Sequence, residues 1–467
     1  MTLMIALSGG WGGNLQAGNG RTSSIVIDTP AYVPNPYYDI SHIEASMRLT
    51  FDDNNLERPE WPAPPNVDEA PCMVTAGSTN SLLNCLRRQI TAKRVIVPAG
   101  TYSLPQNGFQ IRSDDMWLDM DDNATLVGGM HVHDANRIKI TGGNITRGEM
   151  VITNVDDFVM DNVNLWLEAP GGPVGTGPLG AGKRRGFLIC QQFGANPTNC
   201  NRVAIINTTC ISNITCALNS ATMPGQGPGT YGVNSLIFAN YSAWARFDNG
   251  VTAPNPEFVS RLQGTNRVLI VDSHYRTASK QRASGVGTPI SINDEKPAQR
   301  FHYGGIATLL ANSKLETVGT FTSIYVDTTA AADEHIDSFD IDNLFVIGNE
   351  IHSYADAFGT TLKTSDISID DSVQGAGSVN QITLVHLENN EAFHPVRSGF
   401  RVVGNWDGTG GQANCGGRDP CLRNINNTGV VVAGLELGDD RNGDPFGFSV
   451  ALDGSPWSGS AHVHPGL

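Results

Sequence analysis

The sequence predicts an all-β protein folded as a parallel β-solenoid, and a recurring phrase is the main observation behind this prediction. Asn or Asp is followed by a run of alternating aliphatic residues, and a second Asn or Asp commonly closes the phrase. Copies occupy residues 136–140, 156–161, 201–207, 234–240, 266–272, 342–349 and 380–386. Each copy indicates a short strand bounded by residues that tolerate tight turns. Such a strand buries its apolar face only by stacking on its neighbours, which predicts the solenoid.

The composition agrees with this prediction. Among 467 residues there are 52 Gly, whereas charged residues make up 16% and aromatic residues 7%. This composition fits a protein with many turns and short strands that bury small apolar side chains better than it fits a helical bundle. No apolar run is long enough to cross a bilayer, so we expect no membrane-spanning helix. Residues 1–7 are too short and lack the basic start of a complete signal peptide.

The charge and the cysteines indicate the compartment and exclude one class of partner. A formal net charge of −16 argues against nucleic acid as a general partner. None of the cysteines forms a CxxC unit, so a zinc ribbon or redox motif is not expected. The cysteines fall in close pairs along the chain: Cys72 with Cys85, Cys190 with Cys200, Cys210 with Cys216, and Cys415 with Cys421. Sequence-local disulfides are the plain interpretation, and they predict a secreted, extracellular protein.

The first elements can be placed in order along the chain. Residues 1–77 are rich in Gly, Asn and Pro, so we expect an irregular extension packed on the solenoid. Residues 78–90 predict a short capped helix with its leucines on one face. Strands are expected directly after it, over 94–104 and 116–120, with a third around Phe109 between them.

This order of elements resembles the right-handed parallel β-helix proteins of the pectate-lyase-like class. The resemblance lies in the helix before the first rung, the strand ending in the Pro98-x-Gly-x-Tyr102 turn, and the phrase Asp121–Gly129. It covers residues 78–407 and implies a single right-handed parallel β-helix with an N-terminal capping helix at 78–90. Residues 408–467 then form a C-terminal cap and tail. Lyases, hydrolases, epimerases and phage depolymerases share this opening, so the resemblance implies action on polysaccharides without choosing the reaction.

Insertions that interrupt the repeat mark the expected binding face. They occupy residues 168–199, 217–232, 246–264, 274–304 and 353–378. In solenoids, such insertions form loops on one face, which is often the face that binds a ligand.

A concentration of basic residues lies in one of these insertions. The stretch 274–302 holds His274, Tyr275, Arg276, Lys280, Arg282, Lys296, Arg300 and His302, followed by Tyr303. Asp294 and Glu295 are its acidic residues. A positive patch on an acidic protein suits an anionic substrate, although a solvated basic loop is the simpler interpretation. Lys183 and Arg184 belong to a second basic cluster that is open to the same two interpretations.

β-Elimination from a uronic acid needs a cation for the carboxylate, a base for the C5 proton and an acid for the leaving oxygen. We therefore expect a polysaccharide lyase acting on an acidic glycan. Lys280 is the predicted base or carboxylate neutraliser, Arg282 the clamp or proton donor, and His302 or Tyr303 their partner. The predicted substrate contacts are Arg276, Arg300, Lys183 and Arg184.

Two alternatives stay open. Acidic residues gather between Asp327 and Asp342, and a glycoside hydrolase needs two carboxylates. Asp333, Glu334 and Asp356 are the candidates for that reaction, whereas the last acidic residues of the cluster fit the turns of the repeat. The other alternative is a non-catalytic glycan-binding or adhesive protein, because a β-helix alone does not imply an enzyme.

Metal signals are weak. His131 with His133, and His462 with His464, provide two ligands each, which do not make a site, so we predict no metal centre from them. Residues 439–444 have the oxygen-rich, glycine-turned character of a calcium loop, so Ca²⁺ stays open as a cofactor. We expect a monomer whose partner is an anionic polysaccharide.

Overall fold

The structure is a computed structural model that describes part of the chain. The described residues are 41–67, 70–87, 93–105, 108–167, 186–190, 200–212, 215–219, 233–247, 260–263, 265–279, 299–302, 307–318, 322–327, 341–354, 365–371, 382–393, 398–404, 422–425, 427, 435–437, 450–452 and 455–456. Contacts divide the chain into units Met1–Ala31 and Tyr32–Leu467, and all described residues belong to the second unit. The predicted domain boundaries after residues 77 and 407 stay predictions.

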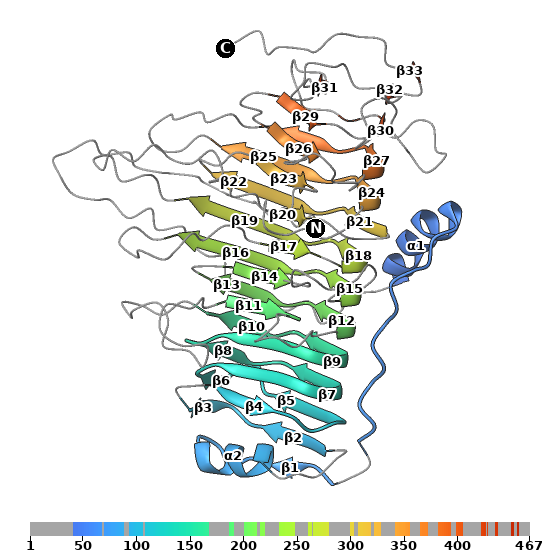
Figure 1. Cartoon of the computed structure of the whole chain (residues 1–467). Coiled ribbons are helices and arrows are strands. Elements are labelled where there is room, and N and C mark those ends of the chain that lie inside the picture. Colours follow the sequence, from blue (N-terminus) through green and yellow to red (C-terminus); the bar gives the residue numbers. More distant parts are fainter. Residues whose placement is uncertain are drawn as a thin grey trace, which may run out of the picture. The chain divides into compact units, whose positions relative to one another are not determined.

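Parallel strands in three stacks, which we call I, II and III, form the body of the molecule (Figure 1). The chain visits the stacks in this order, and one visit to all three makes a rung. Stack I contains β2 (Lys93–Val97), β5 (Met116–Met120), β12 (Cys200–Ile206), β15 (Val233–Ala239), β18 (Thr265–Val271), β21 (Ala307–Ala311), β24 (Ile341–Ile347), β27 (Ile382–Glu388), β30 (Leu422–Ile425) and β32 (Val450–Leu452). β1 (Cys72–Met73) pairs with β2, and the short β33 (Ser455–Pro456) pairs antiparallel with β32.

Stacks II and III complete each rung. Stack II contains β3 (Gly100–Ser103), β6 (Ala124–Val127), β8 (Asn144–Thr146), β10 (Asn164–Trp166), β13 (Thr209–Ser212), β16 (Ser242–Phe247), β19 (His274–Ser279), β22 (Lys314–Val318), β25 (Glu350–Tyr354) and β28 (Glu391–Phe393). Stack III contains β4 (Phe109–Ile111), β11 (Gly186–Ile189), β14 (Thr215–Asn219), β17 (Ser260–Gln263), β20 (Gln299–His302), β23 (Thr322–Asp327), β26 (Ser365–Asp371), β29 (Ser398–Gly404) and β31 (Leu435–Leu437). The long strands β7 (Met130–Thr141) and β9 (Met150–Asp161) pass from stack III into stack I. The predicted parallel β-helix is confirmed.

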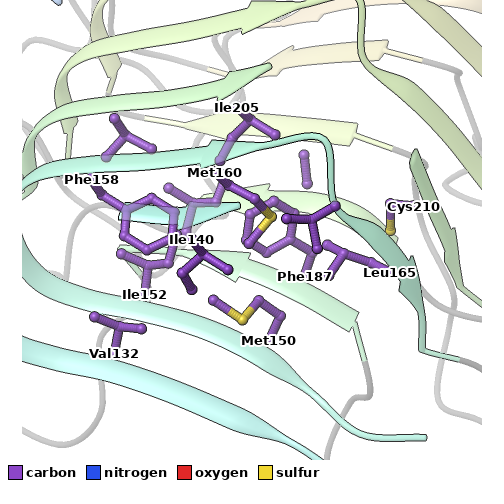
Figure 2. Packing of buried hydrophobic residues seen from close by; sticks show 14 of the residues in the cluster. Val132, Ile140, Met150, Ile152, Phe158, Met160, Leu165, Phe187, Ile205 and Cys210 are labelled. Atoms are coloured by element: carbon purple, nitrogen blue, oxygen red, sulfur yellow. The ribbon is translucent and has the colours of Figure 1, made fainter. Parts of the chain in front are cut away.

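The core is the column of inward side chains that successive rungs stack on one another. Figure 2 shows part of it, including Val132, Ile152 and Phe158 from β7 and β9 and Phe187 from β11. All four of these side chains are fully buried. Because each strand contributes only a few apolar side chains, a single rung has no core of its own, and neighbours supply it.

The repeat predicts one inward column made of the residues two positions after the first Asn or Asp: Ile138, Val203, Leu236, Val268, Leu344 and Ile382. The structure confirms this column in all but its last member. The backbone register of β7, β9, β12, β15, β18, β21 and β24 gives this column in order. Its members are Ile138, Phe158, Val203, Leu236, Val268, Thr308 and Leu344. The next position belongs to Val385, not to the predicted Ile382, which pairs with Ile341. The prediction aligned the repeats by their first Asn, whereas the structure aligns them by the turn that follows the strand.

That turn joins stack I to stack II and explains the Asn or Asp that closes the repeated phrase. From the turn between β9 and β10 to the turn between β27 and β28, one residue in each has a positive φ: Asn162, Asn207, Asn240, Asp272, Asn312, Gly348 and Asn389. Asn, Asp and Gly tolerate this left-handed conformation better than other residues do. Some of the side chains also bond from rung to rung; for example, Asn240 Nδ2 donates to Asn207 Oδ1 at 2.9 Å.

Two helices precede the strands. The helix α2 (Thr79–Arg87) lies within the predicted segment 78–90 and buries Leu82, Cys85 and Leu86. The helix α1 (Ser41–Thr50), followed by the 3₁₀ helix η1 (Asp52–Asn54), lies in the segment for which the sequence predicted irregular structure. Its apolar residues Ile43 and Met47 are spaced by one helical turn, a signal too short to stand out among Gly- and Pro-rich neighbours.

Disulfide bonds join three of the predicted pairs. They link Cys72 to Cys85, Cys190 to Cys200, and Cys210 to Cys216, and no described cysteine is free. The fourth predicted pair, Cys415 and Cys421, lies outside the described residues. Disulfides persist in oxidising compartments, so these three indicate a location outside the cytoplasm. No helix in the described part of the chain has the length and hydropathy of a membrane span.

Candidate functional site

The basic stretch singled out in the sequence is divided between two faces of the β-helix. His274 and Arg276 lie on β19 in stack II, whereas Arg300 and His302 lie on β20 in stack III. A corner of the β-helix separates these stacks, so the described residues of the stretch do not form one flat patch. Its central residues Lys280 and Arg282, together with Tyr303, lie outside the described residues.

Other predicted site residues are also outside the described part of the chain. These are the second basic cluster with Lys183 and Arg184, and the alternative carboxylates Asp333, Glu334 and Asp356. The predictions for them are untested and enter below only as proposals.

On stack III, the backbone register brings chemically reactive residue types into two adjacent columns. Arg261 of β17 pairs with Arg300, and Arg300 pairs with Tyr325 of β23. Two residues further along the same strands, His302 pairs with Asp327. Adjacent strands lie about 4.8 Å apart, so the backbones of the residues in each pair are close neighbours.

These two columns extend toward the C-terminal end of the β-helix. Tyr325 pairs with Ser368 of β26, which pairs with Arg401 of β29. In the other column, Asp327 pairs with Asp370. Stack III therefore carries guanidinium and phenol residue types in one column, and imidazole and carboxylate residue types in the other.

On stack II, a cluster of charged side chains surrounds one buried carboxylate. The side chain of Glu316 on β22 is only 6% exposed. His274 Nε2 lies 3.0 Å from its Oε2, Lys314 Nζ lies 3.1 Å from its Oε1, and Arg276 Nε lies 3.5 Å from Oε2. The residues come from β19 and β22, which the register places side by side.

The electrostatics of this cluster limit its chemistry. Burial alone would raise the pKa of Glu316, but the hydrogen bond and charge of His274 and those of Lys314 lower the pKa to about 2. A carboxylate with so low a pKa is a poor proton acceptor near neutral pH. Glu316 therefore holds its cationic neighbours in place and is not a candidate for acid–base catalysis.

Aromatic side chains adjoin this cluster. The guanidinium carbon of Arg276 lies 5.2 Å from the ring centroid of Trp244, within the range of a cation–π contact. The imidazole of His274 meets the same indole edge to face, with 6.1 Å between centroids. Two residues of the predicted basic stretch are thus fixed by neighbours that sequence reasoning missed, namely Trp244, Lys314 and Glu316.

The structure describes one of the two histidine pairs, His131 and His133. His131 is buried, and desolvation together with the nearby charge of His133 lowers its pKa to about 4, so it is neutral near pH 7. His133 interacts instead with Arg112 and Asp134. In the described residues, no group of three His, Cys, Asp or Glu side chains is arranged to hold a metal ion. Residues 439–444, His462 and His464 lie outside them.

Comparison with solved structures finds similarity to parallel β-helix proteins of several activities. The mannuronan C-5 epimerase A-module of Azotobacter vinelandii is 10% identical with a TM-score of 0.44, over 84% of this chain and 93% of that one. An alginate lyase is 10% identical with a TM-score of 0.38, over 80% and 85%. The surface adhesin PfbA of Streptococcus pneumoniae is 10% identical with a TM-score of 0.40, over 80% and 92%.

These similarities leave the activity open, because an epimerase, a lyase and an adhesin score alike. No protein-family model matches the sequence, and a search of curated proteins finds no match.

Proposed function

We propose that the protein is a secreted polysaccharide lyase that cleaves an acidic, uronate-containing glycan by β-elimination. The observation that supports this best is the register on stack III, which aligns Arg261, Arg300 and Tyr325 in one column and His302 with Asp327 in the next. An elimination site needs a cation, a base and an acid close together, and these residue types supply all three.

In this proposal the substrate carboxylate is neutralised by Arg300 or Arg282, which makes the C5 proton more acidic. A base takes that proton, the C4–O bond breaks as the C4=C5 double bond forms, and an acid protonates the departing oxygen. His302 beside Asp327 suits the base, because a carboxylate orients an imidazole and raises its basicity. Tyr325 is then a candidate acid, in addition to Arg282, which the sequence predicts as clamp or proton donor. Lys280 stays the alternative base or carboxylate neutraliser, with Tyr303 as its partner.

Arg276 is proposed as a substrate contact at most. Its guanidinium is occupied by Trp244 and Glu316, and it lies on stack II, not on stack III with the other candidates. Lys183 and Arg184, which lie outside the described residues, stay proposed substrate contacts.

The test is a panel of acidic polysaccharides with product formation followed by ultraviolet absorbance, which reports the C4=C5 double bond. Arg300→Ala and His302→Ala should each lower kcat by about 10²-fold or more, because each removes a charge or proton-transfer group from the transition state. Arg48→Ala, an exposed substitution on α1, is the matched control and should leave kcat unchanged.

The alternative hydrolase is favoured by one observation. Asp327 and Asp370 pair in register on stack III, which offers two carboxylates in addition to Asp333, Glu334 and Asp356. Reducing ends without ultraviolet absorbance would overturn the lyase proposal and favour this reaction. In that case, amide substitutions of these carboxylates should abolish turnover, while Arg300→Ala should mainly raise KM. Binding without any product would indicate an adhesive protein.

A further inference from the structure

The N-terminal segment 55–67, which we call the strap, follows the outer side of stack I. Its backbone N–H groups donate at intervals of three residues: Asn66 to Asp115 Oδ1 at 2.9 Å, Ala63 to Asp157 Oδ1 at 2.8 Å, and Glu60 to Ser235 Oγ at 3.1 Å. No helix or strand is present in the strap. Its prolines at 59, 62, 64 and 65 favour an extended conformation, since each fixes φ near −65°.

The acceptors of these bonds form one line across the rungs. The acceptors share one position of stack I, and arginines fill this position on rungs between and after them. In order along the stack, the residues at this position are Asp115, Arg137, Asp157, Arg202, Ser235 and Arg267. Successive strap contacts are therefore two rungs apart, which is about 9.6 Å at a strand spacing of about 4.8 Å. Three residues of a polyproline II chain advance about 9.3 Å. The strap and the β-helix thus have matching repeats.

Charge complementarity adds to this match. Glu60 lies 3.3 Å from Arg202 and 3.6 Å from Arg267, and Glu57 forms a closer ion pair with Arg267. Within the line itself, Arg137 pairs with Asp115 and Arg202 with Asp157. Arg267 has no such acidic partner in the line, so the strap supplies it.

The helix α1 anchors the strap on an apolar area further along the stack. Ile43, Met47 and Phe51 are buried against outward residues of β12, β15, β18, β21 and β24. Each of these strands contributes at least one such residue, namely Ala204, Ile237, Leu269, Leu309 and Phe345 in chain order. Trp61 Nε1 donates to Glu44 Oε1 at 2.7 Å, which ties the strap to the helix.

We propose that the outer face of stack I is a peptide-binding site, and that its ligand is a separable amphipathic helix followed by a proline-rich, acidic segment. In this chain residues 41–67 occupy the site. The site selects its ligand by three features: an apolar helix face, polyproline II spacing and carboxylates placed for Arg202 and Arg267. This binding site is independent of the proposed lyase activity.

The first test cleaves the strap from the intact, folded chain. A specific protease sequence is inserted between Asp68 and Glu69, and the cut protein is passed over a gel-filtration column under native conditions. If the face is a binding site, the N-terminal fragment co-elutes with the remainder of the protein. Separation of the two fragments while the remainder keeps a strand-dominated circular dichroism spectrum would overturn the proposal.

The second test measures the site in trans. The same cut in a Met47→Asp chain should release the fragment, because a carboxylate replaces a buried apolar side chain. A labelled synthetic peptide of residues 41–67 should then bind the remainder saturably. Glu60→Gln in the peptide should weaken binding about 3–5-fold, whereas Asp53→Asn, an exposed change of the same kind in η1, should change it less than about 2-fold. Equal losses for both substitutions would overturn the proposal.

Discussion

At the scale of single residues, Glu316 should make stability depend on pH. Its folded pKa of about 2 lies below the value of about 4.3 expected in the unfolded chain. The ionised carboxylate therefore stabilises the fold above that ordinary value and loses this contribution as the pH falls toward 2. Glu316→Gln should lower the free energy of unfolding by about 1–3 kcal/mol at pH 7, and the difference from wild type should shrink below about pH 4.

Urea unfolding followed by circular dichroism at several pH values would measure this difference. Glu391→Gln changes an exposed carboxyl on the same stack, so it serves as the control and should have little effect at any pH. A deficit of Glu316→Gln that is equally large at pH 3 and pH 7 would contradict the prediction.

For single residues, the sequence predicts which residue types are important but not which side chains contact them. Arg276 was expected in a basic loop, yet its partners Glu316 and Trp244 are distant in sequence and lie on adjacent strands of stack II. The strand pattern around Lys314 and Glu316 is visible in the sequence. The pairing of β19 with β22 depends on the lengths of the intervening loops, which no local pattern determines.

At the scale of elements, a buried asparagine ladder next to the stack I–II turn should be essential. Asn390 Nδ2 donates to Val346 O and to Asn427 Oδ1, both at 2.8 Å, and its Oδ1 accepts from the N and Nδ2 of Asn349. Asn390 is 1% exposed, so removal of its amide leaves buried groups without partners. Asn390→Ala should cost about 2–4 kcal/mol of unfolding free energy.

The neighbouring position offers a contrast within the same turn. Asn389 is exposed and has a φ of 53°, a conformation that glycine adopts without strain. Asn389→Gly should therefore change the free energy of unfolding by less than about 0.5 kcal/mol. If chemical denaturation finds the two substitutions equally harmful, the ladder is not the source of the stability.

The strands and turns were predictable where the conformational preference of a residue coincides with its place in the repeat. Turn residues such as Asn207 and Asn240 mark strand ends because a positive φ selects them, and three disulfide pairs followed from spacing. Ile382 was misplaced because the repeats were aligned by their first Asn or Asp. Wherever the structure describes it, that residue has no positive φ to fix its place relative to the strand, whereas a residue in the turn that closes the repeat does. The helix α1 was missed because its stability depends on packing against stack I, not on local propensity.

At the scale of the whole molecule, the net charge should oppose the proposed substrate at long range. A protein with a formal charge of −16 repels an anionic polysaccharide, whereas the stack III column that contains Arg261 and Arg300 attracts it locally. Raising the ionic strength from about 0.01 M to 0.1 M shortens the Debye length from about 30 Å to 10 Å. This change screens the distant repulsion more than the contacts at the site.

If the lyase proposal holds, kcat/KM on the acidic glycan should therefore rise about 2–10-fold over this range. It should fall again near 1 M salt, where a Debye length of about 3 Å weakens the local contacts as well. Initial rates from ultraviolet absorbance would measure the profile, and Arg300→Gln should flatten the fall at high salt because it removes one of those contacts. A kcat/KM that decreases steadily from the lowest salt would show that local attraction dominates at all distances and would contradict this prediction.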